Sequence, residues 1–263
     1  PDMHERKGIP HHLIDIVDPN GEYSVVKFQQ MARDCISSIN LKNKIPILAG
    51  GTGLYVKSLL EGYYFNPAPQ NAEFREHCMD LFRKYGNIFL YNMLFDISPE
   101  TAARLHPNDV RRVIRALEIA HFNDNSVSVD KIAVNNRLIY DALVIGLEMD
   151  RVALYQRINE RVDQMLSKGL IDEVASLLEN GVSPTAQCMQ AIGYKEIVAY
   201  LMKHTDLETA ITKIKQGTRN FAKRQLTWYR KMPYVKWFNI TENDYKDLLE
   251  FIYNEIAGKF CLK

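Results

Sequence analysis

Short apolar runs alternate with amphipathic stretches at the beginning of the chain. Residues 11–17 (HHLIDIV) are predicted to form a short buried strand, and Ser24 then stands where an N-cap begins a helix over residues 25–41. Residues 45–49 are a second apolar run of strand length, which leads through a glycine turn into helical spacing over residues 54–60. The order strand, turn, helix indicates the α/β class.

The pattern changes between residues 66 and 136. Pro67 and Pro69 interrupt the chain, and the stretches that follow have helical spacing. Residues 140–149 return to a strand pattern around the apolar run 142–147, which suits a buried strand of a mainly parallel sheet covered on both faces. Beyond them the pattern predicts helices, apart from a strand at residues 235–238. The predicted division is a core in two parts and an all-helical insertion: residues 1–65, 140–263 and 66–139.

Composition narrows the functional classes only a little. The chain has 263 residues, of which 46% are hydrophobic, so it can bury a substantial core. Its formal net charge of +1 does not by itself indicate a nucleic-acid partner. The apolar runs are far shorter than the roughly 20 residues that span a bilayer. The four cysteines are widely separated, without a C-x-x-C pair, which favours free thiols in a reducing, cytoplasmic compartment.

The glycine turn at residues 50–53 (GGTG) is a candidate phosphate site. A turn that opens a helix directs backbone N–H groups outward at the positive end of the helix dipole. The sequence GTGLYVKS resembles a Walker A loop, but Val56 precedes Lys57 where that motif requires glycine, so we reject this interpretation. The alternative is that the glycines serve only close strand–helix packing. Thr52 favours a function, because its hydroxyl is expected at the carboxyl end of a strand, where ligands of open α/β sheets bind.

Residues 209–241 contain no acidic residue. A helical projection separates an apolar face, which includes Phe221 and Trp228, from a cationic sector, so we expect a helix buried on one side. A solvated helix face is one interpretation. The sharper one is contact with a polyanion, either RNA phosphates or a diphosphate. The cations of this stretch are Lys213, Lys215, Arg219, Lys223, Arg224, Arg230, Lys231 and Lys236.

A second basic cluster is predicted in the first turns of a helix that follows residues 107–109. Its arginines, Arg111, Arg112 and Arg115, oppose the helix dipole there, so an anionic partner would compensate them. Pairing between Arg115 and Glu118 is the equally open alternative. The adjacent His11 and His12 point to opposite faces of a strand and are not expected to share a metal ion.

Five blocks of the sequence together carry a resemblance to a known family. In order and spacing over nearly the whole chain they closely resemble the tRNA dimethylallyltransferases. The blocks are residues 9–19 (IPHHLIDIVDP), 45–60 (IPILAGGTGLYVKSLL), 105–118 (LHPNDVRRVIRALE), 189–196 (MQAIGYKE) and 218–229 (TRNFAKRQLTWY).

The resemblance implies an activity and partners. It implies a P-loop NTPase-like parallel-sheet core that transfers a dimethylallyl group from its diphosphate to the N6 amine of the adenine beside the tRNA anticodon, with Mg²⁺ assisting departure of the diphosphate. The helical insertion is then expected to hold the anticodon stem-loop, largely by shape. A cytoplasmic monomer is expected.

The resemblance also implies site residues. Thr52 matches a threonine of the catalytic channel that contacts tRNA, and Arg75 matches an arginine near the start of the insertion. Further tRNA contacts are implied at Arg111, Arg112, Arg115, Gln190, Gly193, Tyr194, Lys195, Lys223, Arg224, Gln225 and Arg230. Diphosphate contacts are implied at Gly51, Gly53 and Arg219.

The sequence departs from the family pattern in one important respect. The glycine-rich P-loop with its lysine, and the Asp-Ser segment whose aspartate is the expected general base, are not in the sequence and are expected upstream of Pro1. Residues 122–137 also match the family poorly. Two rival functions stay open, a small-molecule kinase of the P-loop type and a non-catalytic RNA-binding module. The acid-free helix counts against the kinase.

Overall fold

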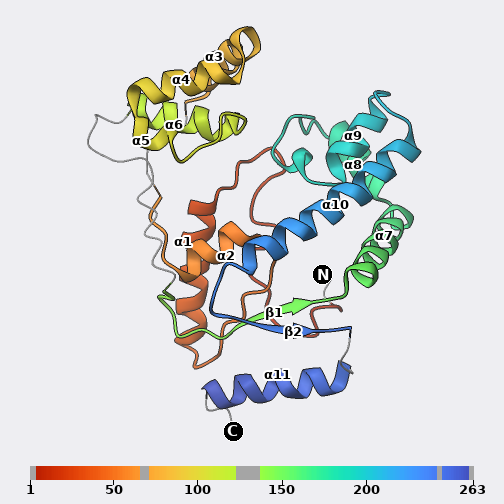
Figure 1. The fold of residues 1–263 in the computed structure, drawn as a ribbon. Helices are drawn as coiled ribbons and strands as arrows, with labels where there is room; N and C mark the ends of the chain where they lie inside the picture. Colours follow the sequence, from red (N-terminus) through yellow and green to blue (C-terminus); the bar gives the residue numbers. More distant parts are fainter. Residues whose placement is uncertain (1–3, 66–70, 123–136, 242–244, 261–263) are drawn as a thin grey trace. The chain divides into compact units, whose positions relative to one another are not determined.

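The computed structural model describes residues 4–65, 71–122, 137–241 and 245–260. The chain divides into two compact units, which Figure 1 shows. One unit comprises Pro1–Glu61 and Asn136–Lys263, and the other Gly62–Asn135. Each unit has its own cluster of buried apolar side chains.

Two helices follow the irregular first residues of the first unit. Helix α1 (Val25–Asn40) begins as predicted, with the Ser24 hydroxyl accepting a hydrogen bond from the Lys27 N–H. Helix α2 (Gly53–Leu60) packs against α1. The Gln29 carboxamide donates to the Ser58 carbonyl at 2.7 Å and is buried. The position of α2 is therefore fixed from the α1 side.

The sheet that the structure describes consists of a parallel pair. Strand β1 (Val144–Glu148) runs beside β2 (Val235–Asn239), with Val144 opposite Val235 and Glu148 opposite Asn239. Both strands were predicted from the apolar runs at residues 140–149 and 235–238. Gly146 lies opposite Trp237, where a Cβ would meet the indole ring at 2.7 Å.

The prediction of strands at residues 11–17 and 45–49 was wrong. Both segments are irregular and largely exposed, and Ile47 is 85% exposed. An extended segment becomes a strand only when a neighbour pairs with its N–H and C=O groups, and neither segment pairs with β1 or β2 in the described residues. Positive φ angles at Leu13 and Asp15 also interrupt the first run. The predicted parallel-sheet core is thus reduced to β1 and β2, and most of the described chain is helical.

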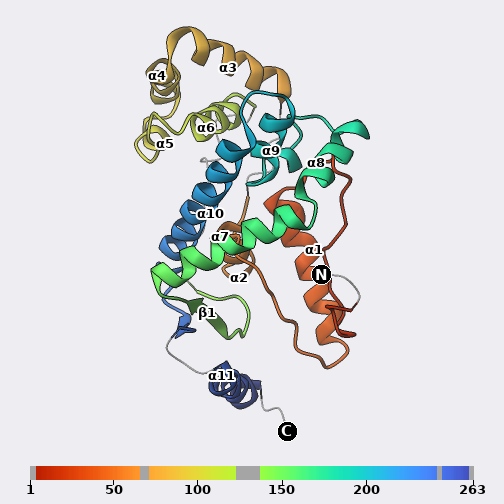
Figure 2. The same cartoon turned by 90° about the vertical axis from the view of Figure 1, so that its right-hand side faces the viewer.

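The helices between β1 and β2 pack around a second cluster of apolar residues that includes Met189, Ile197 and Ile214. Asp150 and Asp206 cap the first and last of these helices. In the described residues no helix is long and apolar enough to cross a membrane. The elements are α7 (Arg151–Ser167), α8 (Leu170–Glu179), η1 (Cys188–Gln190), α9 (Tyr194–Leu201) and α10 (Leu207–Tyr229), and α11 (Tyr245–Phe260) follows β2. Figure 2 shows α10 as the long helix of this unit.

The second unit is helical where it is described, as the pattern predicted. Leu90, Leu94, Val113 and Leu117 are almost fully buried in its core. The poorly matching stretch at residues 122–137 falls almost entirely outside the described residues. The helices are α3 (Ala72–Tyr85), α4 (Asn87–Ile97), α5 (Pro99–Ala102) and α6 (Val110–Phe122).

Candidate functional site

A shallow hollow of about 490 Å³, open to solvent and called the groove below, lies along the C-terminal half of α10. Lys223, Arg224 and Lys231 are exposed there, and the Arg224 guanidinium lies 5.7 Å from the centre of the Phe221 ring. Cations beside aromatic rings suit a nucleic acid, because they can bind phosphates and stack on bases. The lining residues are Asn220, Lys223, Arg224, Thr227, Trp228 and Lys231.

The apolar face predicted for this helix is only partly buried. Ala210 and Ile214 are buried, but Phe221 and Trp228 are each 37% exposed. The reason is that the core around Met189 covers the N-terminal half of α10, whereas the groove opens along the C-terminal half. The prediction was therefore wrong for the two aromatic residues that lie at or beside the groove.

Acids from other elements neutralise several cations of the acid-free stretch. Lys215 pairs with Asp163 at 2.6 Å and Arg230 pairs with Glu148 at 3.2 Å. The Arg219 guanidinium donates to Asn159 and also lies 5.8 Å from the Tyr155 ring centre. The sequence could not indicate these partners, because they are distant along the chain. The groove cations are thus the candidates for a polyanion contact.

The glycine turn packs directly against this part of α10. The Gln225 carboxamide nitrogen donates to the Gly51 carbonyl at 2.9 Å. A Cβ at Gly51 would lie 2.0 Å from that nitrogen, and one at Gly53 would lie 2.3 Å from Cδ1 of Trp228. Both glycines are therefore required for close packing, but their partner is α10 and not a strand.

Thr52 occupies the N-cap position of α2 and is exposed. Its side chain makes no capping hydrogen bond, so the hydroxyl is left for another partner. It lies at the start of a helix and not, as predicted, at the end of a strand, because residues 45–49 form none. Lys57 lies 3.7 Å from the buried Glu61 at the other end of α2, which agrees with rejection of a Walker A loop.

A buried carboxylate organises the predicted arginines of the second unit. Glu118 is fully buried and accepts hydrogen bonds from Arg75 at 2.9 Å, Arg115 at 2.5 Å and the Asn71 N–H at 2.7 Å. Burial raises the pKa of Glu118, but the bonds from Arg75, Asn71 and Arg115 outweigh it and hold this pKa below its ordinary value. The spacing had suggested the Arg115 pair, whereas nothing in the sequence indicated the one with Arg75.

The neighbouring arginines of α6 are more accessible. Arg111 and Arg112 are exposed, and Arg112 lies 3.4 Å from Asp109 in an ion pair that water screens. The structure thus separates the predicted arginines into two groups. Arg75 and Arg115 surround a buried acid, and Arg111 and Arg112 face solvent.

The predicted contacts around α9 are mainly engaged within the chain. Gly193 has a φ of +102°, and its N–H donates to Glu196. The Tyr194 hydroxyl donates to Glu173, and burial together with this bond raises the pKa of Tyr194 to about 12. Gln190 and Lys195 are exposed.

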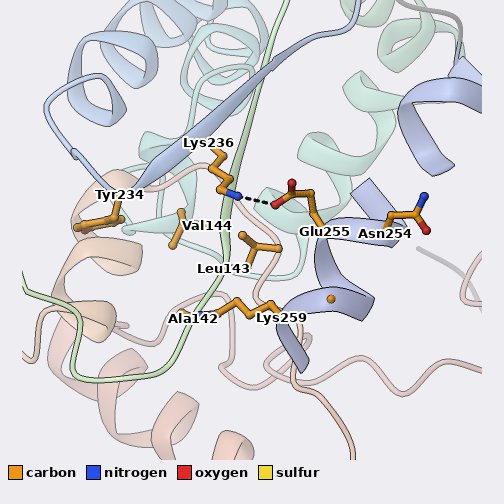
Figure 3. A pocket seen from close by; sticks show the side chains of 9 residues that line it. Ala142, Leu143, Val144, Tyr234, Lys236, Asn254, Glu255 and Lys259 are labelled. Carbon is orange, nitrogen blue, oxygen red and sulfur yellow. Dashed lines mark hydrogen bonds and ion pairs between the residues drawn. The ribbon is translucent and has the colours of Figure 1, made fainter. Parts of the chain in front are cut away.

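A second hollow of about 460 Å³ lies between the strands and α11 (Figure 3). The Lys236 ammonium contacts the Glu255 carboxylate at 2.5 Å, as Figure 3 shows. The Lys259 ammonium forms a similar ion pair with the Asp141 carboxylate. Because both lysines have carboxylate partners, this hollow lacks the net positive charge of the α10 groove. No sequence motif had pointed to it.

The described residues do not form a dedicated metal cage. Among them no group of three or more His, Cys, Asp or Glu side chains could hold a metal ion. His11 is exposed, and its Nδ1 lies 2.8 Å from the Ile9 carbonyl oxygen. The glycine turn and the groove lining contain no carboxylate, so a Mg²⁺ ion there would depend chiefly on diphosphate oxygens and water.

Comparison with known proteins shows the family of the chain. Residues 1–232 match the family described as IPP transferase. The chain belongs to this family. The tRNA dimethylallyltransferase of Alkaliphilus metalliredigens is 44% identical to this IPP transferase family member over 262 residues, which cover 100% of the chain and 84% of that relative. Among solved structures, the full-length tRNA isopentenylpyrophosphate transferase of Bacillus halodurans is 41% identical, with a TM-score of 0.71 over 99% of this chain and 81% of that one.

A more distant structure is also similar to this IPP transferase family member. It is a eukaryotic dimethylallyltransferase acting on tRNA, with 29% identity and a TM-score of 0.76 over 98% of this chain and 68% of that chain. The IPP transferase fold, which is related to the P-loop NTPases, is therefore shared despite the few strands described.

Proposed function

We propose that this chain is a tRNA dimethylallyltransferase, which transfers a dimethylallyl group from its diphosphate to the N6 amine of the adenine beside the anticodon. The observation that carries the proposal is that the cationic, aromatic groove of α10 adjoins the turn bearing Thr52. A polyanion held in the groove brings a base close to the Thr52 hydroxyl, which makes no capping hydrogen bond. Membership of the IPP transferase family supports the same reaction.

In this proposal each group of residues has a role that follows from its chemistry. Lys223, Arg224 and Lys231 bind RNA phosphates, because they are exposed and line a groove without an acid. The adenine leaves its stack to be modified, and the Thr52 hydroxyl holds it by a hydrogen bond. The glycine turn offers N–H groups to the diphosphate at the N-terminus of α2. Mg²⁺, which the family resemblance implies, would neutralise charge on the diphosphate oxygens.

The second unit, with its exposed Arg111 and Arg112, holds the anticodon stem-loop in this proposal. Arginine forks suit the phosphate backbone of a folded RNA loop. Glu118 holds the guanidiniums of Arg75 and Arg115 in place by ion pairs, and in this fixed position the two arginines contribute to RNA binding in this proposal.

Disruption of the gene for this chain tests the function. Mass spectrometry of tRNA nucleosides is expected to show loss of prenylated adenosine, and the intact gene is expected to restore it. Retention of the prenyl group would overturn the proposal. A chain that binds tRNA without affecting prenylation would be an RNA-binding module, and one that phosphorylates a metabolite without binding tRNA would be a kinase.

Arg224→Ala is expected to weaken tRNA binding about tenfold, because one charge-assisted phosphate contact is lost. The slope of log Kd against log salt concentration should decrease by about 1, which is the contribution of one phosphate contact. Filter binding between 50 and 200 mM salt measures both. Lys168→Ala removes an exposed cation outside the groove and serves as the matched control. Equal losses in the two variants would argue against the groove as the RNA site.

Thr52→Ala is expected to slow transfer up to about tenfold, because one neutral hydrogen bond contributes about 1 kcal/mol. Binding of tRNA should change less than about twofold, since the phosphate contacts remain. Single-turnover rates with labelled dimethylallyl diphosphate separate the two effects. A variant that binds tRNA poorly but transfers at the normal rate once saturated would contradict this role.

A further inference from the structure

One side chain fastens the glycine turn to α10. The Gln225 carboxamide donates to the carbonyl oxygen of Gly51, and the contact is partly buried. That oxygen belongs to the peptide unit that joins Gly51 to Thr52. Because a trans peptide is planar and its C=O and N–H point in opposite directions, holding the carbonyl also fixes the direction of the Thr52 N–H.

The rest of α2 is already held from its other side. The rings of Phe28 and Tyr55 stack with centres 4.8 Å apart, and Gln29 binds the Ser58 carbonyl. Freedom therefore remains chiefly in the turn before the helix, where glycines permit many backbone angles. The hydrogen bond from Gln225 removes that freedom next to Thr52.

Gln225 is also placed to link the turn with the groove. It follows Arg224 directly in α10, and Trp228, which lines the groove, lies where a Cβ on Gly53 would clash. One turn of α10 thus carries both the cationic lining and the contact with the glycine turn. One N–H of the carboxamide is used within the protein, so the contact with the turn is made without RNA.

We infer that Gln225 is a positioning residue, which holds Thr52 for the transfer reaction through the Gly51–Thr52 peptide. This inference rests on the proposed function. It assigns Gln225 a role different from a direct tRNA contact. Thr52 touches the substrate, and Gln225 acts through it.

Gln225→Met in the full-length natural protein tests this role, because methionine has a similar length but no donor. The kcat of transfer is expected to fall about 5- to 10-fold, while the KM for tRNA changes less than about twofold. In a Thr52→Ala background the same change should cost less than about twofold more, because the two residues act as a unit. Gln216→Met, at an exposed glutamine of α10, is the matched control and should leave kcat unchanged.

Two outcomes would overturn the inference. A higher KM for tRNA with an unchanged kcat would show that the amide contacts RNA, and a full multiplicative loss in the double variant would show independence from Thr52. If Gln225→Met fails to fold, Gly51→Ala carries the same test, because its Cβ displaces the amide from the carbonyl. A natural protein without any transfer activity would instead overturn the proposed function.

Discussion

Glu118→Ala is expected to lower the free energy of unfolding of the helical unit by about 3 kcal/mol. The change leaves the Arg75 and Arg115 guanidiniums and the Asn71 N–H without the buried acceptor that they share. The value is at the low end for a broken buried pair, since both arginine side chains are about a third exposed. Urea denaturation followed by circular dichroism measures the effect.

The pH dependence distinguishes loss of charge from loss of packing. The folded pKa of Glu118 is below its unfolded value, so its contribution is present above about pH 4.3 and is lost as pH falls through the folded pKa. Glu118→Gln keeps the shape but should abolish this part of the acid dependence. Arg83→Ala removes an exposed pair with Asp80 and should cost less than about 1 kcal/mol. Equal destabilisation by Arg83→Ala and Glu118→Ala would rule out a special role for Glu118.

Gly53→Ala is expected to lower kcat/KM for transfer about 100-fold, because the new methyl group overlaps the Trp228 ring at 2.3 Å. Either the indole or the start of α2 must move, and a shift of about 1 Å at a reacting group can cost this much. Overpacking should also destabilise the protein by about 1–3 kcal/mol. Steady-state kinetics and thermal unfolding measure the two effects.

A second change can test the cause of that loss. Trp228→Leu removes the ring that the methyl group meets, so the double variant should be more active than Gly53→Ala alone. Gly258→Ala is the matched control, because a Cβ there meets no atom within 4 Å. Because Trp228 also lines the groove, thermal unfolding decides the cause: no recovery of stability in the double variant would mean that the glycine is needed for some reason other than contact with Trp228.

Local sequence signals predicted the elements that depend on local chemistry. Ser24 indicated the start of α1 through its cap, and the apolar run at residues 140–149 indicated β1. The runs at residues 11–17 and 45–49 failed as strands, because a strand also needs a partner and apolar pattern alone cannot supply one. The same limit applies to any strand predicted singly.

The candidate site could also be predicted only as far as it depends on local sequence. Glycines at 51 and 53 marked a close backbone approach, but only the structure showed that Gln225 and Trp228 make it. The absence of acids along residues 209–241 suggested that the cationic sector of this helix is not neutralised. Asp163 and Glu148 pair with two of its cations from other elements, and such distant partners cannot be found from spacing along one helix.

The parallel pairing of β1 with β2 has a consequence for how the protein folds. The strands are adjacent in space, yet the helices α7 to α10 lie between them in the chain. Closing so long a segment costs entropy before any pairing is gained, whereas the helices depend on contacts nearby in sequence. We therefore expect the helices to gain hydrogen-exchange protection first during refolding, and the strand amides of residues 144–148 to gain it last.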